Sequence, residues 1–404
     1  MNSYLNRALI LYVMCWTFFP FMQVGTLYRL LAITCAGLWI LFFLLNKPYF
    51  LKENATYLIC ALSLIAIFLL GNLIFGLGIV GAIAYTLQLI IIFLVGIMSK
   101  YVFKYDKSFA KALFVILLLA ICVFCVTTTI SVIKNPYAAR IANSEWLENR
   151  FEGNEMVGLY GFIYMCVLMA PMLLHLIQKK CFRGFVEFLV KVSFLLIFVM
   201  IIFAGYMIAI FLLFGSCIIM WSFAQKNFIK SLVALSLFAL FVIFYQQIID
   251  SIFTHLMNLF EDNPVYYNKF RDFRIMFLQG DISGETVEGR FKNYLGSLKN
   301  VYHYPVLGQY FYAENGYGGG HSAIFDIMGR YGWLAIILFT YLIIIYPHKT
   351  NKNRRWIVLN YAVLISTIVF SIFDPCFQEI GIALYFIYPF VIKCTEENFL
   401  EGNE

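Results

Sequence analysis

Long runs of apolar residues alternate with short polar segments along almost the whole chain. Crossing the apolar core of a bilayer takes about 20 residues of helix, and about 12 of these runs approach or exceed that length. They cover residues 8–26, 28–45, 56–75, 79–98, 112–133, 156–177, 186–203, 206–223, 231–249, 323–346, 356–373 and 376–393. Backbone groups in lipid must be hydrogen-bonded within their own segment, so each run predicts a helix. The pattern therefore predicts an all-α polytopic membrane protein.

The composition supports this prediction. Of the 404 residues, 62% are hydrophobic and only 13% are charged, and the mean hydropathy is +0.84. A soluble domain could not bury that much apolar surface, so the bilayer is expected to be the solvent of this chain.

Lysine and arginine fall mainly on one predicted side of the membrane. With the N-terminus in the cytoplasm, the inside segments hold most of the 29 basic residues: Arg7, Lys47, Lys52, Lys100, Lys104, Lys107, Lys111, Lys179, Lys180, Arg183, Lys191, Lys226, Lys230, Lys349, Lys352, Arg354, Arg355 and Lys393. Cytoplasmic loops of membrane proteins carry such an excess. Both termini are thus predicted to be cytoplasmic. The net charge of +7 is explained by these anchors and does not indicate a nucleic-acid partner.

Two polar segments are then predicted to face outward. The longer one separates two groups of helices, so the chain has three parts. Residues 1–249 are predicted to contain transmembrane helices 1 to 9, with an external loop at 134–155. Residues 250–322 form one large external loop. Residues 323–404 are predicted to contain helices 10 to 12 and a cytoplasmic tail. Chemistry is most expected in the large loop, because cations, glycines and a histidine meet there near a membrane surface.

An amphipathic helix is predicted over residues 290–302 of this loop. Phe291, Tyr294, Leu295, Leu298, Val301 and Tyr302 recur at helical spacing, and Lys292, Asn293, Lys299 and Asn300 fall on the other side. Arg290 is then in the first turn, where unpaired N–H groups and the helix dipole favour anions. Its guanidinium could bind two phosphate oxygens at once. Pairing with Glu285 or Glu288 explains the spacing equally well.

The loop returns to an apolar run through Gly318-Gly319-Gly320-His321-Ser322. Ser322 is predicted to be the N-cap of a helix that begins at Ala323. His321 would then lie at the positive end of a transmembrane helix, which favours the neutral ring and lets it accept a proton. A histidine that only caps or anchors is the structural alternative. Asp326, one turn further, either orients polar groups of a site or supports the helix start.

Other outer residues are candidates for substrate binding. Arg140 and Arg150 lie in the first outer loop, and Arg271 and Arg274 lie in the second. Arg150 comes directly before a span, where it could bind a lipid headgroup or form half of a pyrophosphate clamp. Tyr310 is one of several loop tyrosines that could stack on sugars, although interfacial aromatic belts give the same pattern.

Several of these motifs resemble those of a known family. Gly289-Arg290, Tyr304-Pro305-Val306-Leu307-Gly308, Gly320-His321-Ser322 and Asp326-Ile327-Met328-Gly329-Arg330-Tyr331-Gly332 resemble segments of the Wzy-type O-antigen and capsular polysaccharide polymerases, and of their sister O-antigen ligases. Arg150 and the span through Gly161-Phe162-Ile163-Tyr164 are similar to the first-loop region of such polymerases. Many relatives also carry a Ser-Arg pair where this chain has Ala204-Gly205-Tyr206. The role of that arginine would fall to Arg150, Arg140 or another residue.

The resemblance implies a GT-C-like glycosyltransferase of the bacterial inner membrane, with its active site on the periplasmic or extracellular face. Such enzymes join oligosaccharides carried on undecaprenyl pyrophosphate, without a metal, another cofactor or a nucleotide sugar. His321 would be the base, and Arg290 with Arg150 would bind the pyrophosphate. Expected partners are the lipid-linked oligosaccharide and membrane lipid. A chain-length regulator and a flippase are candidate protein partners.

Two alternatives stay open at this point. A ligase, which transfers finished polymer to another acceptor, would use the same donor chemistry, but the missing Ser-Arg pair favours a polymerase. A transporter of lipid-linked oligosaccharides belongs to another class. Transporters tend to place ionisable residues in the middle of spans and to contain internal repeats. This chain has few of the former and no repeat that we detect.

Overall fold

The computed structural model describes residues 3–19, 22, 26–46, 48–134, 138, 157–158, 160–224, 233, 236, 239–261, 264–279, 287–312, 322–349, 356–373 and 378–395. These residues are almost entirely helical and include no strand, as the apolar runs predicted. Six of the helices are long and apolar enough to cross a membrane, and four shorter ones are also apolar. The protein is therefore an all-α, membrane-embedded protein.

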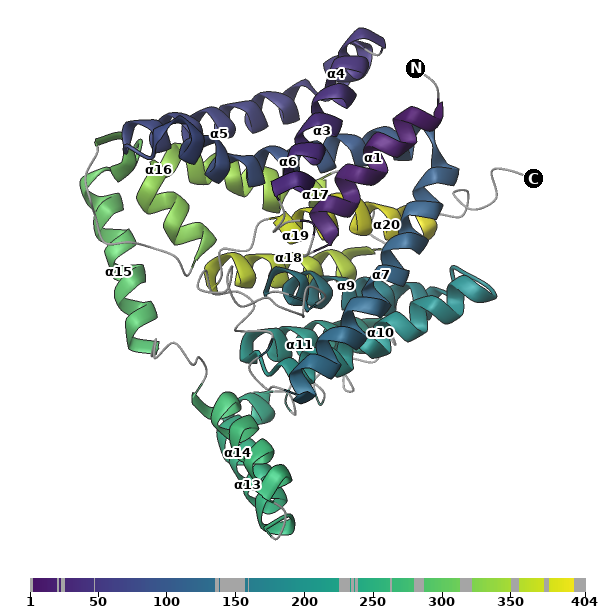
Figure 1. Ribbon diagram of the computed structural model, residues 1–404, viewed down its shortest axis with the longest axis vertical. Helices are drawn as coiled ribbons and strands as arrows, with labels where there is room; N and C mark the ends of the chain where they lie inside the picture. The colour runs from purple at the N-terminus through teal and green to yellow at the C-terminus, as the bar shows by residue number, and fades with distance from the viewer. Residues whose placement is uncertain are drawn as a thin grey trace. The chain divides into compact units, whose positions relative to one another are not determined.

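Most predicted spans overlap helices (Figure 1), but the first helix covers Ser3–Phe18 where 8–26 was predicted, and the helix predicted at 79–98 extends to Tyr105. In the first half of the chain these helices are α1 (Ser3–Phe18), α3 (Thr26–Asn46), α5 (Ala55–Ile74), α6 (Gly78–Tyr105), α7 (Lys107–Lys134), α9 (Tyr160–Lys179), α10 (Phe185–Ala204) and α11 (Met207–Ala224), with the short α4 (Pro48–Glu53) between α3 and α5. Of the predicted span at 231–249, the structure describes residues 233, 236 and 239–249. The next described helix, α13 (Tyr245–Leu259), continues across the predicted loop boundary at residue 250.

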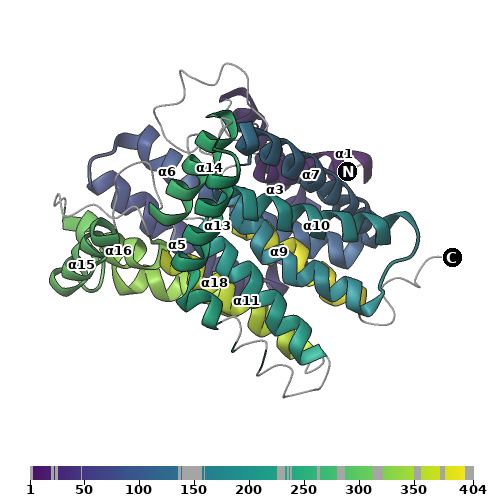
Figure 2. The same cartoon turned by 90° about the horizontal axis from the view of Figure 1, so that it is seen from below.

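The chain divides into two compact units, and the long polar segment is shared between them. One unit comprises residues 115–286 and 356–366. Its central helix is α9, in which all residues from 161 to 173 are buried and which packs against α10 and α11. It also holds α13 and α14 (Pro264–Gln279), which form an antiparallel hairpin visible in Figures 1 and 2. Phe253 stacks on Phe277 in that hairpin, and Phe260 lies against Phe270.

The other unit comprises residues 1–114, 287–355 and 367–404. Here α6 packs closely on α5 because Gly96 leaves room for Tyr57, whose hydroxyl donates to the Phe93 carbonyl over 3.0 Å. Gly381 of α19 (Gln378–Ile382) gives α6 a second close neighbour at Ile92. This unit also contains α15 (Val287–His303), the 3₁₀ turn η2 (Gln309–Tyr312) and α16 (Ala323–Phe339).

Two C-terminal helices contain π-helical turns. α16 continues through η3 (Thr340–Ile345) into α17 (Tyr346–Lys349), and α19 continues through η5 (Ala383–Ile387) into α20 (Tyr388–Thr395). The Tyr385 hydroxyl donates to the Leu342 carbonyl over 2.7 Å and so joins the two π-helical segments. The remaining helix, α18 (Ile357–Phe373), runs across the division between the two units.

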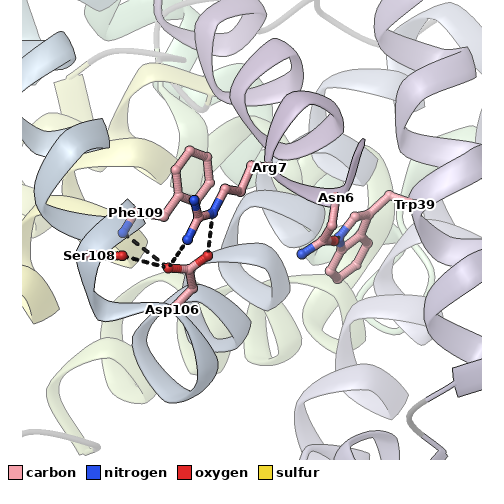
Figure 3. A network of polar contacts seen from close by, with 6 residues as sticks. All are labelled: Asn6, Arg7, Trp39, Asp106, Ser108 and Phe109. Carbon is pink, nitrogen blue, oxygen red and sulfur yellow. Dashed lines mark hydrogen bonds and ion pairs between the residues drawn. The ribbon is translucent and has the colours of Figure 1, made fainter. Parts of the chain in front are cut away.

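A charged network links α1 to the junction of α6 and α7 (Figure 3). Arg7 donates from Nε and one Nη to the two carboxylate oxygens of Asp106, over 2.7 and 3.0 Å. Asp106 also caps α7, because its Oδ1 accepts from the Phe109 amide over 3.2 Å and from the Ser108 hydroxyl over 3.0 Å. One carboxylate thus fixes three segments at the side that the basic residues predict to be cytoplasmic.

Replacing Asp106 with asparagine is expected to lower stability by about 1–2 kcal/mol, since it removes the charge from a cap and a bidentate pair. Burial raises the pKa of Asp106, but hydrogen bonds from Arg7, the Phe109 amide and Ser108 hold it below its ordinary value of 3.8 overall. A lowered carboxyl pKa stabilises the fold above the ordinary value and loses that effect as pH falls through the lowered one. Thermal melting of the purified protein should therefore show an acid-dependent loss that is smaller in Asp106→Asn.

Ser108→Ala is the matched control for this prediction, because it removes a single neutral donor to the same carboxylate. It should lower the melting temperature by less than Asp106→Asn and should keep the acid dependence. Equal melting behaviour of both variants at every pH would contradict the role given to the Asp106 charge.

Candidate functional site

The start of α16 is built as the sequence predicted. Ser322 has extended backbone angles, and its Oγ accepts from the Phe325 amide over 3.1 Å, which confirms it as the N-cap. The same hydroxyl donates to the Ser371 carbonyl of α18 over 3.2 Å. Asp326 is buried, and its Oδ2 lies 3.5 Å from the Ser322 amide. Ser322 and Asp326 therefore hold the helix start in place, directly after His321 in the chain.

The predicted amphipathic helix is confirmed as α15, and it lies alongside the first part of α16 (Figures 1 and 2). Tyr294 packs on Phe325 with ring centroids 5.2 Å apart. One turn further on, the backbone of Ser297 comes so close to Gly329 that a Cβ there would lie 3.1 Å from the Ser297 oxygen. The two contacts advance together along both helices, so α15 and α16 run in the same direction. Their N-termini consequently lie at the same end of the pair.

Arg290 is in the first turn of α15, as predicted. It precedes Tyr294 by one turn, just as Ser322 precedes Phe325 at the start of α16. The two helix N-termini, each the positive end of a dipole, thus lie at the same end of the pair, with Val287 of α15 further from the Tyr294–Phe325 contact than Ala323 of α16. This arrangement favours a negatively charged ligand at that end of the pair.

The face of α15 against α16 is formed mainly by small residues. Small residues, Gly296 and Ser297, are buried together with Val301. Leu295, Leu298 and Tyr302 are exposed, Tyr302 by 84%. Close approach of the two backbones through Ser297 and Gly329 explains why the small residues lie inside. The larger apolar side chains remain on a free face, which suits contact with a membrane interface.

The span predicted at 323–346 is confirmed as a helical stretch long and apolar enough to cross a membrane, Ala323–His348, and α16 has a kink in it at Gly332. Gly332 has φ 77° and ψ −173°, which are far from helical values. The Trp333 amide donates to the Pro305 carbonyl over 2.8 Å, and the Leu334 amide donates to the Val306 carbonyl over 3.5 Å. In an unbroken helix these amides would donate four residues back, to Gly329 and Arg330. The loop from Pro305 to Gly308 takes the place of those partners.

Two glycines make this contact possible. A Cβ on Gly332 would overlap the Val306 carbonyl, and a Cβ on Gly308 would overlap the backbone between Arg330 and Tyr331. Both residues also have positive φ, which glycine adopts without strain. We call this contact between residues 305–308 and residues 330–334 the clasp. It joins two separate sequence motifs, residues 304–308 and residues 326–332.

The clasp holds the residues beside it against the end of α5. Tyr310 stacks on Phe75 with a centroid distance of 4.1 Å, and the Arg330 guanidinium carbon lies 5.7 Å from the centroid of the Tyr310 ring. The Tyr331 hydroxyl donates to Asn72 Oδ1 over 2.8 Å. Burial raises the pKa of the Tyr310 phenol, with the Arg330 cation acting in the opposite direction. The result is a partly buried cation against the Tyr310 ring.

The other predicted site residues belong to the unit of residues 115–286 and 356–366 or lie outside the described residues. Arg271 and Arg274 belong to α14, in the unit that contains α9. Arg274 donates from Nε to Asp250 Oδ1 over 2.7 Å and thus ties α14 to α13, whereas Arg271 is exposed. His321, Arg140 and Arg150 lie outside the described residues, and of Arg290 only the backbone is described.

Sequence reasoning missed two residues of this cluster, Arg330 and Asn72. Arg330 lies in the motif at 326–332, and a cation in an apolar run is itself a signal of a functional residue. Asn72 is an amide near the end of a predicted span, which is a weaker signal of the same kind. Among the residues described, no group of three or more His, Cys, Asp or Glu side chains is placed to hold a metal ion.

Comparison of the chain with protein-family models found no match, and a search of curated proteins found none either.

Proposed function

We propose that the chain is a polysaccharide polymerase with a GT-C-like arrangement of about 12 transmembrane helices. It transfers a growing glycan from undecaprenyl pyrophosphate to the non-reducing end of a lipid-linked repeat unit. The reaction takes place on the outer face of a bacterial inner membrane. The observation that carries the proposal is the parallel packing of α15 and α16, which brings the starts of two helices to the same end. One start carries Arg290, and the other directly follows His321.

The reaction needs two things from the protein. A hydroxyl of the acceptor sugar attacks the anomeric carbon, and a new C–O bond forms while the bond from that carbon to the pyrophosphate oxygen breaks. His321 accepts the hydroxyl proton, which general-base catalysis makes worth about 10²–10⁴-fold in rate. Arg290 and the two helix N-termini stabilise the charge that develops on the leaving pyrophosphate. Arg150 supplies a second cation to the pyrophosphate.

Inactivating the gene in its native host tests the function directly. The lipid-linked sugars would then be extracted and separated by chain length. A polymerase is expected to leave single repeat units on lipid and no longer chains. Accumulation of lipid-linked polymer would instead indicate a ligase, and repeat units confined to the inner leaflet would indicate a transporter. Either of those results, or an unchanged polymer, would overturn the proposal.

A further inference from the structure

Lys100 lies near the end of α6, at the side that the basic residues predict to be cytoplasmic, and it is only partly exposed. Its Nζ donates to Asn54 Oδ1 over 2.8 Å and to the Tyr346 hydroxyl. It also lies 4.4 Å from the centroid of the Tyr346 ring and 5.8 Å from that of the Tyr57 ring. The start of α5, the end of α6 and α17 thus meet around one ammonium group, which the fold holds in place.

Every one of these contacts is with a neutral group. The oxygens of Asn54 and Tyr346 carry only partial charges, and ring faces attract a cation weakly. The Glu53 carboxylate, next to Asn54 in the chain, pairs instead with Lys104 over 2.6 Å. In the part of the chain that the structure describes, no carboxylate forms an ion pair with Lys100. Because a partly buried charge needs a counter-charge, an anion from another molecule is expected beside it.

The geometry around Lys100 defines the chemistry of that anion. An ammonium group has three donors, and the two hydrogen bonds of Lys100 leave one of them for a further acceptor. Lys104 follows one helical turn later on the same face of α6, and it is exposed. Two cations at this spacing suit the several oxygens of a phosphate.

The surroundings favour a phosphate that is attached to a lipid. α5 presents apolar side chains soon after Asn54, because Ile59 and Leu62 are each 63% exposed, so acyl chains can lie against this helix. Tyr49 of α4 and Tyr105 of α6 are also exposed, and tyrosines gather at the level of lipid headgroups. Basic sites between transmembrane helices on the cytoplasmic side bind anionic headgroups in this way.

We propose that Lys100 and Lys104 bind the phosphate of an anionic phospholipid at this side of the membrane. The site lies at the opposite end of α5 from the clasp, since Asn54 directly precedes the helix and Asn72 is near its last residue. It therefore does not rest on the proposed glycosyl transfer.

A lipid bound there would stabilise both π-helical segments. Tyr57, beside Lys100, packs on Tyr346, which directly follows η3, with a centroid distance of 4.7 Å. It also packs on Tyr385 of η5, with a centroid distance of 5.9 Å. π-helical turns occur frequently at functional sites. Binding should therefore raise the melting temperature of the whole protein.

Thermal melting of the purified full chain in detergent, titrated with lipid, tests the site. The probes are phosphatidylglycerol, phosphatidylcholine with the same acyl chains, and glycerol phosphate without chains. Phosphatidylglycerol is expected to raise the melting temperature with its concentration, as a ligand of the folded state does, and the other two should not. Lys100→Gln should weaken the apparent affinity for phosphatidylglycerol about tenfold, as loss of a charge-assisted hydrogen bond implies. Lys100→Arg keeps the charge and should keep most of the affinity.

Asn54→Asp is the sharpest variant, because it keeps an oxygen beside Lys100 and gives it a negative charge. This internal carboxylate would replace the lipid phosphate as the counter-charge, so the response to phosphatidylglycerol should be lost. Lys107→Gln is the matched control, since it removes an exposed cation at the start of α7 on the same side, and it should respond like the wild type.

Three results would overturn the inference. The first is wild-type affinity for phosphatidylglycerol in a folded Lys100→Gln or Asn54→Asp protein. The second is an equal response of the wild type to phosphatidylglycerol and phosphatidylcholine. The third is a full response to glycerol phosphate alone, which would show a site for free phosphate. If Lys100→Gln does not fold, Asn54→Asp decides the question.

Discussion

Replacing His321 with alanine is expected to abolish polymer while single repeat units remain on lipid. Without a base, the acceptor hydroxyl must lose its proton to water, and the rate falls by about 10²–10⁴-fold. Ser322, the next residue after His321 in the chain, caps α16 and donates to the Ser371 carbonyl of α18. Arg290→Ala should also abolish polymer, because removing one preorganised donor to a developing oxyanion costs about 10²–10³-fold. Chain lengths on lipid would be measured in cells that carry each variant.

His303→Ala is the control for His321. His303 is also in the outer segment, but it is exposed and its Nδ1 lies 2.9 Å from the Lys299 carbonyl at the end of α15. Polymer should form normally in this variant. For Arg290, the lysine substitution should recover part of the polymer, because the charge returns without bidentate geometry. Wild-type chain lengths in His321→Ala or Arg290→Ala would sink the assignment of that residue.

The features that the sequence predicted correctly are those that local chemistry determines. The backbone groups of an apolar run in lipid must be hydrogen-bonded within the run, so the run forms a helix. For this reason α5, α6, α7 and α10 overlap the predicted spans. The Ser322 cap depends on a hydroxyl three residues from an amide, a contact within one turn. α15 follows from a helical repeat of apolar residues in the same way. Each of these signals lies within a few residues of the structure that it forms.

The features that the sequence did not predict depend on contacts between distant segments. The hydrogen bond from Tyr331 to Asn72 joins residues 259 positions apart. The sequence around either residue does not indicate this contact. A glycine such as Gly332 is compatible with an intact helix, and only the arrival of residues 305–308 explains the break. Arg274 looked like a phosphate ligand because its partner, Asp250, lies on the preceding helix of a hairpin whose pairing the sequence did not show.

Gly332→Ala is expected to disrupt the clasp and, with it, polymer formation. At φ 77° and ψ −173° an alanine is strained by about 1–3 kcal/mol. Its Cβ would also overlap the Val306 carbonyl, so the loop must move away. Trp333 and Leu334 would then lose their acceptors at Pro305 and Val306. We expect a lower melting temperature of the purified protein and a loss of long chains on lipid.

Two other glycines separate the causes of that effect. Gly78 has φ 68° with nothing within 4 Å of an added Cβ, so Gly78→Ala introduces backbone strain without a clash. Gly37 is in the middle of α3, also with open space around it, and Gly37→Ala should raise stability by about 0.5–1 kcal/mol through lower chain entropy. The expected order of melting temperature is Gly37→Ala, then Gly78→Ala, then Gly332→Ala, with polymer lost only in the last. If Gly332→Ala melted like Gly78→Ala and still made long chains, the clasp would not be needed for stability or for polymer formation.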